Sequence, residues 1–128
     1  MRFGYTIIYV PNVQAALHFY EQAFGFRSKF IDQSGQYAEL DSGQTILAFA
    51  SEDIAVSHNV RISANRPEGA APGIEIALLS DTVERDFQHA LSFGAVAVKK
   101  PTIMPWGQTV AYVRDLNGVL VEICTPVS

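Results

Sequence analysis

Hydrophobic positions along the chain follow strand spacing and then helix spacing, and this succession begins near the N-terminus. Residues 3–10 are rich in β-branched and aromatic side chains and end at Pro11, which is typical of a strand. From Val13 the apolar residues recur at helical spacing until Gly25, and Asn12 is a suitable cap for this helix. Three short strands separated by turn residues are then predicted at residues 26–32, 36–40 and 45–50.

The same pattern begins again after a connector. Residues 51–72 lose periodicity and gather Ser, Asn, Pro and Gly, which indicates a connector or an ordered arm. Residues 73–79 then predict a strand, and Ser80 or Asp81 is expected to cap a helix that ends near Gly94. Further strands are predicted at residues 95–99, 109–114 and 119–124.

The last two predicted strands form a hairpin around Glu122. The turn is Asp115-Leu116-Asn117-Gly118, because Asn-Gly supplies the positive φ angles that a tight connection requires. Glu122 lies in the second strand among apolar residues. Burying an unpaired carboxylate costs on the order of several kcal/mol, so Glu122 should face water, a partner or a ligand. It is the first candidate for a functional residue.

The two halves match by a constant offset. Val13 and Val83, like Leu17 and Phe87, lie 70 positions apart at matching places on their helices. The sequence therefore predicts an α+β fold of two βαβββ modules, about residues 3–50 and about residues 73–126, in a single domain over residues 1–128. Each module would form a sheet with a helix on one face, and the other faces would enclose a cavity.

Composition and charge limit the classes of binding partner and the cellular compartment that are expected. The 128 residues are 48% hydrophobic and carry a net charge of -4, with the nine basic residues spread along the chain. Without a basic stripe, nucleic acid and anionic membranes are not expected as partners. No apolar run approaches the roughly 18 residues that span a bilayer, and the first residues lack a cleavage signal. The single cysteine, Cys124, favours a reducing compartment, so the expected location is cytoplasmic.

Three stretches carry a resemblance to a known family. They run from Val13-Gln14-Ala15-Ala16-Leu17-His18-Phe19-Tyr20 to Phe26, from Ala90 to Gly94, and from Arg114-Asp115-Leu116-Asn117-Gly118 to Glu122. With the two-module order, they resemble the vicinal oxygen chelate (VOC) superfamily of glyoxalase I, bleomycin-resistance proteins, fosfomycin-resistance enzymes and extradiol dioxygenases. The resemblance implies the fold and a homodimer. It does not select a reaction, because the superfamily holds isomerases, transferases, dioxygenases and binders without catalysis.

The resemblance also implies four positions for metal ligands, on the first and last strands of each module. They correspond to Tyr5, Leu47 or Ala48, Glu75 and Glu122. The family usually has His or Glu at all of them, and a transition-metal site of this type prefers imidazole nitrogen together with carboxylate oxygen. The expectation is therefore a protein without metal or cofactor. The alternative is a divalent metal ion held by Glu75 and Glu122.

Glu75 and Glu122 form the most informative pair. Period-two alternation puts each of them on one face of its strand, and both faces could line the cavity. Two carboxylates held close would raise one apparent pKa, so the pair could share a proton, act as general acid and base, or bind a cationic ligand. Alternatively, each pairs with Arg or Lys or lies on a solvated face.

Other candidates for ligand binding are mainly aromatic. Trp106, in a loop after Pro105, could stack on a flat ligand or simply cover the end of a sheet. His18 and His89 lie beside the apolar stripe of their helices and are expected to be exposed. The complete set of candidate ligand-binding residues is Tyr5, Leu47, Phe49, Glu75, Trp106, Gln108, Tyr112 and Glu122.

The leading expectation is a metal-independent protein that binds a small organic molecule in an acidic, aromatic-lined cavity, in the mode of bleomycin-resistance proteins. One alternative is a glyoxalase-I-like lyase or isomerase. In it, Glu75 and Glu122 would be metal ligands, or catalytic acid and base in proton transfer next to a carbonyl. A second alternative is a scaffold without a small ligand.

Overall fold

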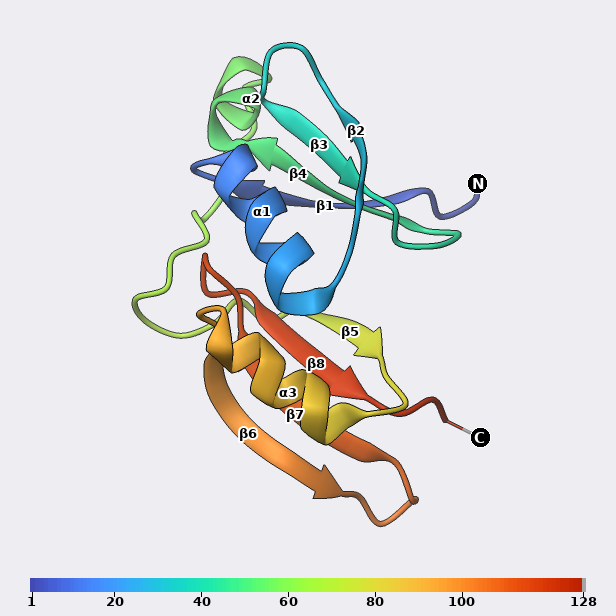
Figure 1. The fold of residues 1–128 in the computed structure, drawn as a ribbon. Helices are drawn as coiled ribbons and strands as arrows, with labels where there is room; N and C mark the ends of the chain where they lie inside the picture. Colours follow the sequence, from blue (N-terminus) through green and yellow to red (C-terminus); the bar gives the residue numbers. More distant parts are fainter. Residues whose placement is uncertain (128) are drawn as a thin grey trace. The chain divides into compact units, whose positions relative to one another are not determined.

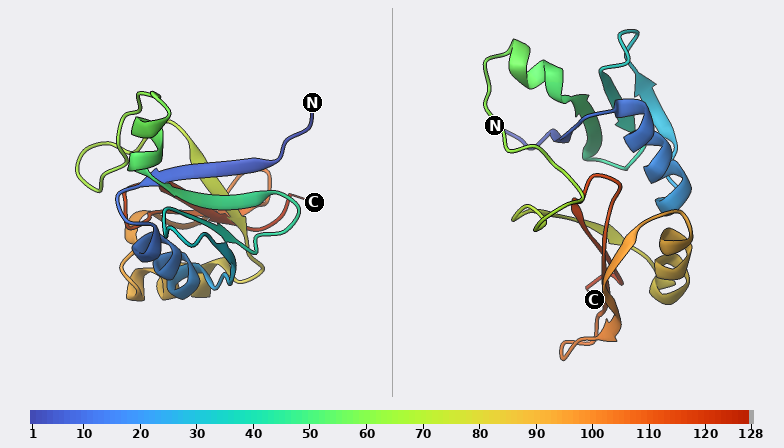
Figure 2. Two further views of the ribbon diagram at one scale, coloured as in Figure 1. Left: turned by 90° about the horizontal axis from the view of Figure 1, so that it is seen from above. Right: turned by 90° about the vertical axis from the view of Figure 1, so that its left-hand side faces the viewer.

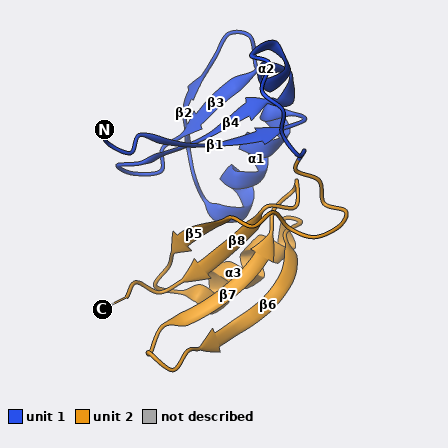
Figure 3. Cartoon of the chain, turned by 180° about the vertical axis from the view of Figure 1, so that it is seen from behind, with its two compact units in different colours: residues 1–64 blue, residues 65–128 orange. Residues whose placement is uncertain are grey.

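The chain folds into two compact units, Met1–Ala64 and Asn65–Ser128, and each is described by itself (Figure 3). The computed structural model describes residues 1–127. The boundary between the units falls inside the expected connector of residues 51–72. None of the helices in the described chain has the length and the hydropathy to cross a membrane. Each unit contains one four-stranded mixed sheet, which confirms the α+β prediction (Figure 1).

The first unit has the predicted order of one strand, one helix and three strands, followed by a short second helix. In its sheet the strands lie in the order β1-β4-β3-β2, with β1 and β4 parallel and the other pairs antiparallel. The elements are β1 (Tyr5–Val10), α1 (Val13–Phe24), β2 (Ser28–Ile31), β3 (Tyr37–Leu40), β4 (Ile46–Ser51) and α2 (Glu52–Ser57).

Local signals fix both ends of α1. The side chain of Asn12 accepts a hydrogen bond from the backbone N–H of Ala15 at 2.9 Å, and Gly25 ends the helix with φ 77°. The ring of Tyr20 packs on Phe49 of β4, with centroids 4.9 Å apart. Because side chains alternate along a strand, Leu47 and Phe49 face α1, and Ala48 lies on the opposite face.

The second unit repeats this arrangement in the order β5-β8-β7-β6, with β5 and β8 parallel. Its helix packs over β6, β7 and β8 on one face of the sheet (Figure 2). The other face carries no helix from the same unit. The elements are β5 (Glu75–Leu79), α3 (Val83–Ser92), β6 (Val96–Ile103), β7 (Thr109–Arg114) and β8 (Leu120–Cys124).

Strand register shows which positions of the two units correspond. In the first sheet Tyr5 pairs with Ile46, and Ala48 lies two residues further along β4. In the second sheet Glu75 pairs with Leu120, and Glu122 lies two residues further along β8. Tyr5 therefore corresponds to Glu75, as the sequence predicted. The sequence left Leu47 and Ala48 as possible counterparts of Glu122 in the first module. Ala48 is the counterpart, and Leu47 is one residue out of register.

The terminal hairpin turns at Asp115 to Gly118, as predicted, but the backbone conformation of the turn differs from the expected one. Gly118 has φ 87°, but the only residue other than glycine with positive φ in residues 1–127 is Asn59, so Asn117 does not adopt a left-handed conformation. The buried Asp115 organises the turn instead. Its Oδ1 accepts hydrogen bonds from the backbone N–H groups of Asn117 at 2.8 Å and Val119 at 2.9 Å.

Arg114 ties the connector to this hairpin. Its Nε donates to the carbonyl of Gly118 at 2.9 Å, its Nη1 to the carbonyl of Gly69 at 2.6 Å, and its Nη2 to the carbonyl of Arg66 at 3.4 Å. One side chain thus holds two backbone carbonyls of the connector against the end of the sheet, so this part of the connector is an ordered arm of the second unit.

The main departures from the predicted elements are an additional helix, a different helix cap and a longer β6. The connector begins with the helix α2, and the side chain of Ser51 caps it by accepting a hydrogen bond from the backbone N–H of Asp53. The sequence did not predict this helix, because six residues are too few to show helical periodicity. The N-cap of α3 is Thr82 instead of Ser80 or Asp81. Strand β6 continues through Pro101 to Ile103, because it is an edge strand where a missing N–H breaks no ladder bond.

Candidate functional site

The open face of the second sheet gathers two carboxyl groups and a phenol from three different strands. Val121 and Ile123 are buried under α3, so Glu122 between them lies on the opposite face. Tyr112 on β7 lies directly across from Glu122, and Ala77, the partner of Glu122 on β5, lies two residues after Glu75. Glu75, Tyr112 and Glu122 therefore share one face, as the alternation in the sequence suggested.

Hydrogen bonds connect these three side chains. The hydroxyl of Tyr112 donates to Oε1 of Glu122 at 3.0 Å. The pKa of Glu75 lies above its ordinary value because partial burial disfavours its charged form. A hydrogen bond with Glu122 and the negative charge of Glu122 raise this pKa further. The arrangement therefore brings the carboxyl group of Glu75 against that of Glu122, which also accepts from the hydroxyl of Tyr112.

Two neighbouring groups are kept neutral. Burial, then the hydrogen bond to Glu122 and its negative charge, raises the pKa of Tyr112 to about 12. The same causes in the same order raise the pKa of Cys124, which is buried at the end of the face, to about 11. Cys124 is therefore a thiol at neutral pH and not a nucleophile, which agrees with the sequence-based interpretation. The face therefore places two carboxyl groups beside a neutral phenol and a neutral thiol.

Lys99 is a charged neighbour that the sequence pattern did not reveal. It lies directly across from Tyr112 in the pairing of β6 with β7. It is exposed, and the structure records no ion pair for it with residues 1–127. The register shifts on both sides of Lys99 interrupt the alternation of side chains along β6, so a period-two pattern could not have placed it.

Trp106 and Gln108 lie away from the carboxyl groups. Trp106 is 66% exposed in the turn between β6 and β7, and its Nε1 donates to Oε1 of Gln108 at 2.8 Å. The amide of Gln108 in turn donates to the carbonyl of Thr125 at 2.6 Å. Gln108 precedes Tyr112 by four residues, which is about 13 Å along an extended strand. Both residues therefore lie at the Cys124 end of the face.

The candidates in the first unit have two different surroundings. Leu47 and Phe49 are buried against α1 and have almost no accessible surface, so they are part of the core. Tyr5 is 56% exposed and lies on the open face of the first sheet. His18 and His89 are exposed on their helices, as predicted.

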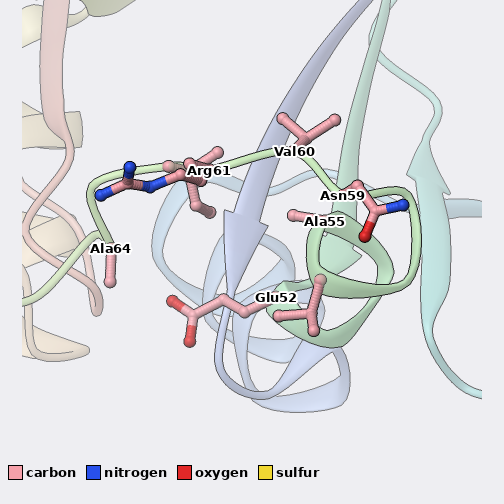
Figure 4. Close-up of a pocket in the computed structure, with 8 residues that line it drawn as sticks. Glu52, Ala55, Asn59, Val60, Arg61 and Ala64 are labelled. Atoms are coloured by element: carbon pink, nitrogen blue, oxygen red, sulfur yellow. The ribbon is translucent and has the colours of Figure 1, made fainter.

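Two hollows lie in the first unit. One, of about 670 Å³, includes Tyr5 and the N-terminal residues that precede it. The other, of about 480 Å³, lies where α2 turns into the connector (Figure 4). There Val60 and Arg61 follow the helix, and Glu52 comes from its first turn. The second hollow contains none of the residues that the sequence singled out.

A metal ion would require more ligands than the carboxyl pair supplies. Among residues 1–127, no three His, Cys, Asp or Glu side chains lie close enough together to hold one. Glu75 and Glu122 would supply oxygen ligands only, and among the described residues the face offers no imidazole beside them to make a group of three. The donor set within the second unit therefore does not fit a transition-metal site.

Comparisons with known proteins agree with this fold. A model of the Glyoxalase/Bleomycin resistance protein/Dioxygenase superfamily matches residues 2–123. A search of curated protein sequences found no match.

Several solved structures are similar over nearly the whole chain. A glyoxalase/bleomycin resistance protein/dioxygenase family enzyme from Burkholderia phytofirmans PsJN has a TM-score of 0.79 at 20% identity, covering 98% of both chains. A glyoxalase-related enzyme from Fulvimarina pelagi has a TM-score of 0.78 at 18% identity, covering 98% of this chain and 88% of its own. TioX from Micromonospora sp. ML1 has a TM-score of 0.73 at 20% identity, covering 98% of both chains. On the family match, the protein belongs to the glyoxalase/bleomycin resistance/dioxygenase (VOC) superfamily.

Proposed function

We propose that the protein binds a small organic molecule, without a metal ion, on the open face of its second sheet. The observation that carries this proposal is the carboxyl pair of Glu75 and Glu122 on one sheet face, beside the hydroxyl of Tyr112. Two carboxyl groups held close on one sheet face repel each other when both are ionised, which lowers the stability of the fold. A bound ligand compensates for this cost.

The charge of the pair indicates the kind of ligand. With one proton, the two carboxyl groups carry a single negative charge, which a ligand with a basic nitrogen would complement. The positive charge of this ligand would also favour the ionised form of both carboxyl groups over the protonated form. Binding of such a ligand is therefore expected to release a proton. Trp106 and Gln108, at the end of the same face, would contact a ligand long enough to reach them.

A screen of small molecules by thermal shift tests the proposal. A ligand that binds only the folded state raises the melting temperature in proportion to its concentration and affinity. Glu122→Gln keeps the shape of the side chain and removes the charge, so it should abolish the shift caused by a basic ligand. Glu68→Gln removes a charge from the exposed connector of the same unit and is the matched control. A ligand whose shift survives Glu122→Gln would contradict the proposed role of the pair.

Calorimetry then tests proton release. Titrations in buffers with different ionisation enthalpies should give apparent binding enthalpies that differ between buffers for the wild type. For Glu75→Gln, which has no proton to lose, the enthalpies should agree. Equal enthalpies for the wild type in all buffers would mean that the shared proton stays in place and that the ligand binds elsewhere.

The enzymatic alternative also has an observation in its favour. A carboxyl group with a raised pKa beside an ionised one can donate and accept a proton, as a glyoxalase-I-like lyase or isomerase requires next to a carbonyl. Protein purified without chelator should then contain stoichiometric metal, or gain stability when Ni²⁺ or Zn²⁺ is added. Substoichiometric metal without such a gain would contradict the metal-dependent version and leave binding as the proposal.

Assembly and location complete the proposal. We propose a cytoplasmic homodimer, supported by family membership and by the absence of a cysteine pair in the sequence, in which Cys124 is the single cysteine. Light scattering of the purified protein measures the first part directly. A monomer at micromolar concentration would contradict it.

A further inference from the structure

The hollow where α2 turns into the connector has the size of a small-molecule site. Its volume is about 480 Å³, and pockets for small ligands typically measure about 300 to 1,000 Å³. Every residue that lines it lies between Glu52 and Ala64, so residues of the first unit alone form it. None of these residues belongs to a strand, so the hollow is not part of the open face of the first sheet.

Backbone hydrogen bonds fix the turn that forms this hollow. The N–H of Val60 donates to the carbonyl of Ala55 at 2.9 Å, and the N–H of Asn59 donates to the carbonyl of Val56 at 3.0 Å. With Asn59 at φ 58°, these bonds make a Schellman motif, which reverses the chain at the end of α2. Figure 4 shows the chain then passing over the helix through Val60 and Arg61. The hollow therefore lies between a helix and a segment whose first turn is rigid.

Three large aliphatic side chains line the hollow and remain in contact with water. Val56 is 73% exposed, Val60 is 49% exposed and Ile62 is 40% exposed, whereas Ala55 is buried. Single exposed apolar side chains are common, but three that line the same hollow form a patch. A ligand with an aliphatic group would cover this patch, and the removal of apolar surface from water would favour binding.

The hollow also has one charge of each sign. Arg61 is exposed, and the structure records no hydrogen bond or ion pair for its side chain with residues 1–127. Glu52 is half-buried and takes part in another interaction, but the two oxygens of a carboxylate together accept about four hydrogen bonds, so it can also accept from a ligand. Figure 4 shows both charged groups directed to the side of Ala64. Because the two charges cancel, a zwitterion complements the hollow better than an anion or a cation.

We propose that this hollow is a second binding site, for an α-amino acid with an aliphatic side chain. The guanidinium of Arg61 binds the carboxylate through two parallel hydrogen bonds, and the carboxylate of Glu52 accepts from the ammonium group. The aliphatic side chain lies against Val56 and Ile62. Both charged groups of an α-amino acid are attached to one carbon atom, which agrees with Arg61 and Glu52 being directed to the same side of the hollow.

Titration with L-leucine, followed by backbone amide NMR, tests this site. The amide signals of Val60, Arg61 and Ile62 should shift and saturate. Arg61→Gln should weaken binding about threefold to tenfold, the effect of losing a charged hydrogen bond at a solvent-accessible site. Arg27→Gln removes an exposed positive charge from the segment between α1 and β2 of the same unit and should leave the affinity unchanged.

Three smaller probes separate the parts of the proposal without changing the protein. 4-Methylpentanoate lacks the ammonium group of leucine and 3-methylbutylamine lacks its carboxylate, so each should bind at least about fivefold more weakly than leucine. Glycine keeps both charges and should also bind more weakly, because it cannot cover Val56 and Ile62. Equal binding of any of the three probes, or no saturable shift with leucine, would overturn the proposal.

Two other outcomes would assign the observations to a different cause. A response to leucine that survives Arg61→Gln and disappears in Glu122→Gln would mean that leucine binds at the carboxyl pair of Glu75 and Glu122, and would overturn the proposal. Self-association that rises with protein concentration and is abolished by Val56→Ser would assign the apolar patch to an interface between copies of the chain, and would overturn it as well.

Discussion

Replacing Gly118 by alanine should destabilise the second unit far more than the same change at another left-handed glycine. An ideal Cβ on Gly118 would lie 2.2 Å from the carbonyl oxygen of Arg66 and 2.6 Å from Nη2 of Arg114. Gly107 has a similar φ of 97°, compared with 87° at Gly118, but a Cβ there would meet nothing within 4 Å. Comparing Gly118→Ala with Gly107→Ala therefore separates steric conflict from backbone strain.

The expected magnitudes follow from these two terms. A left-handed conformation costs a residue with a Cβ about 1–2 kcal/mol, which both variants incur. Forcing an extra carbon into an occupied space adds about 1–3 kcal/mol at Gly118 alone, because the obstacle includes backbone of the connector. Alanine also makes the unfolded chain less flexible than glycine does, which stabilises the folded state equally in both variants. This gain cancels when the two variants are compared. We therefore expect Gly118→Ala to lose about 1–3 kcal/mol more stability than Gly107→Ala.

Cys124 provides an assay that reports on the second unit alone. It is the single cysteine of the chain and is buried in β8, so a thiol reagent labels it only when this unit opens. Pulsed labelling across a urea gradient gives the midpoint of that opening for each variant. If the midpoints of the two variants agree, the connector moves away from the added Cβ without loss of stability. The hydrogen bonds from Arg114 then do not hold the connector in place. Hydrogen exchange confined to residues 66–69 would show the same failure locally.

Three further outcomes are expected. The pKa of Glu75 in the native state is raised above its ordinary value of 4.5, so the free energy of unfolding should fall as the pH rises from this value towards neutrality. Glu75→Gln should flatten this slope in urea titrations. An unchanged slope would contradict a protonated Glu75. Ultraviolet titration should show Tyr37 and Tyr112 still protonated at pH 11, since the pKa of each is raised to about 12, and Tyr112→Phe should remove one late-titrating phenol. Asn59 follows α2 with a left-handed φ of 58°. In thermal unfolding, Asn59→Gly should therefore stabilise the first unit by up to about 1 kcal/mol, and Asn59→Ala should destabilise it. The reverse order would contradict a left-handed helix cap.

Elements with local signals could be predicted from sequence, and α1 is the clearest case. Its cap at Asn12, its apolar stripe and its stop at Gly25 all lie within one short stretch, and the structure has all three. The short helix α2 lacked such a pattern, because six residues complete fewer than two turns. The extension of β6 through Pro101 depended on its position at the sheet edge, which only the strand order reveals.

The candidate site, like the fold, could be predicted only where the signal lies within a single strand. Alternation placed Glu75 and Glu122 on faces of their strands, but their contact depends on the parallel pairing of β5 with β8, which is not encoded locally. The choice between Leu47 and Ala48 required the register, since a shift of one residue moves a side chain to the other face. Lys99 was missed because irregular pairing interrupts β6 on both sides.

Parallel pairing also has a consequence for the order in which the protein assembles. In each unit the antiparallel pairs join strands that are neighbours in sequence, whereas the parallel pair joins the first strand of the repeat to the last. Closing the longest loop is the slowest contact to form, so we expect β5 to dock onto β8 after the hairpins exist. Glu75 then meets Glu122 only in a finished sheet, and a partly folded chain presents no carboxyl pair to a ligand.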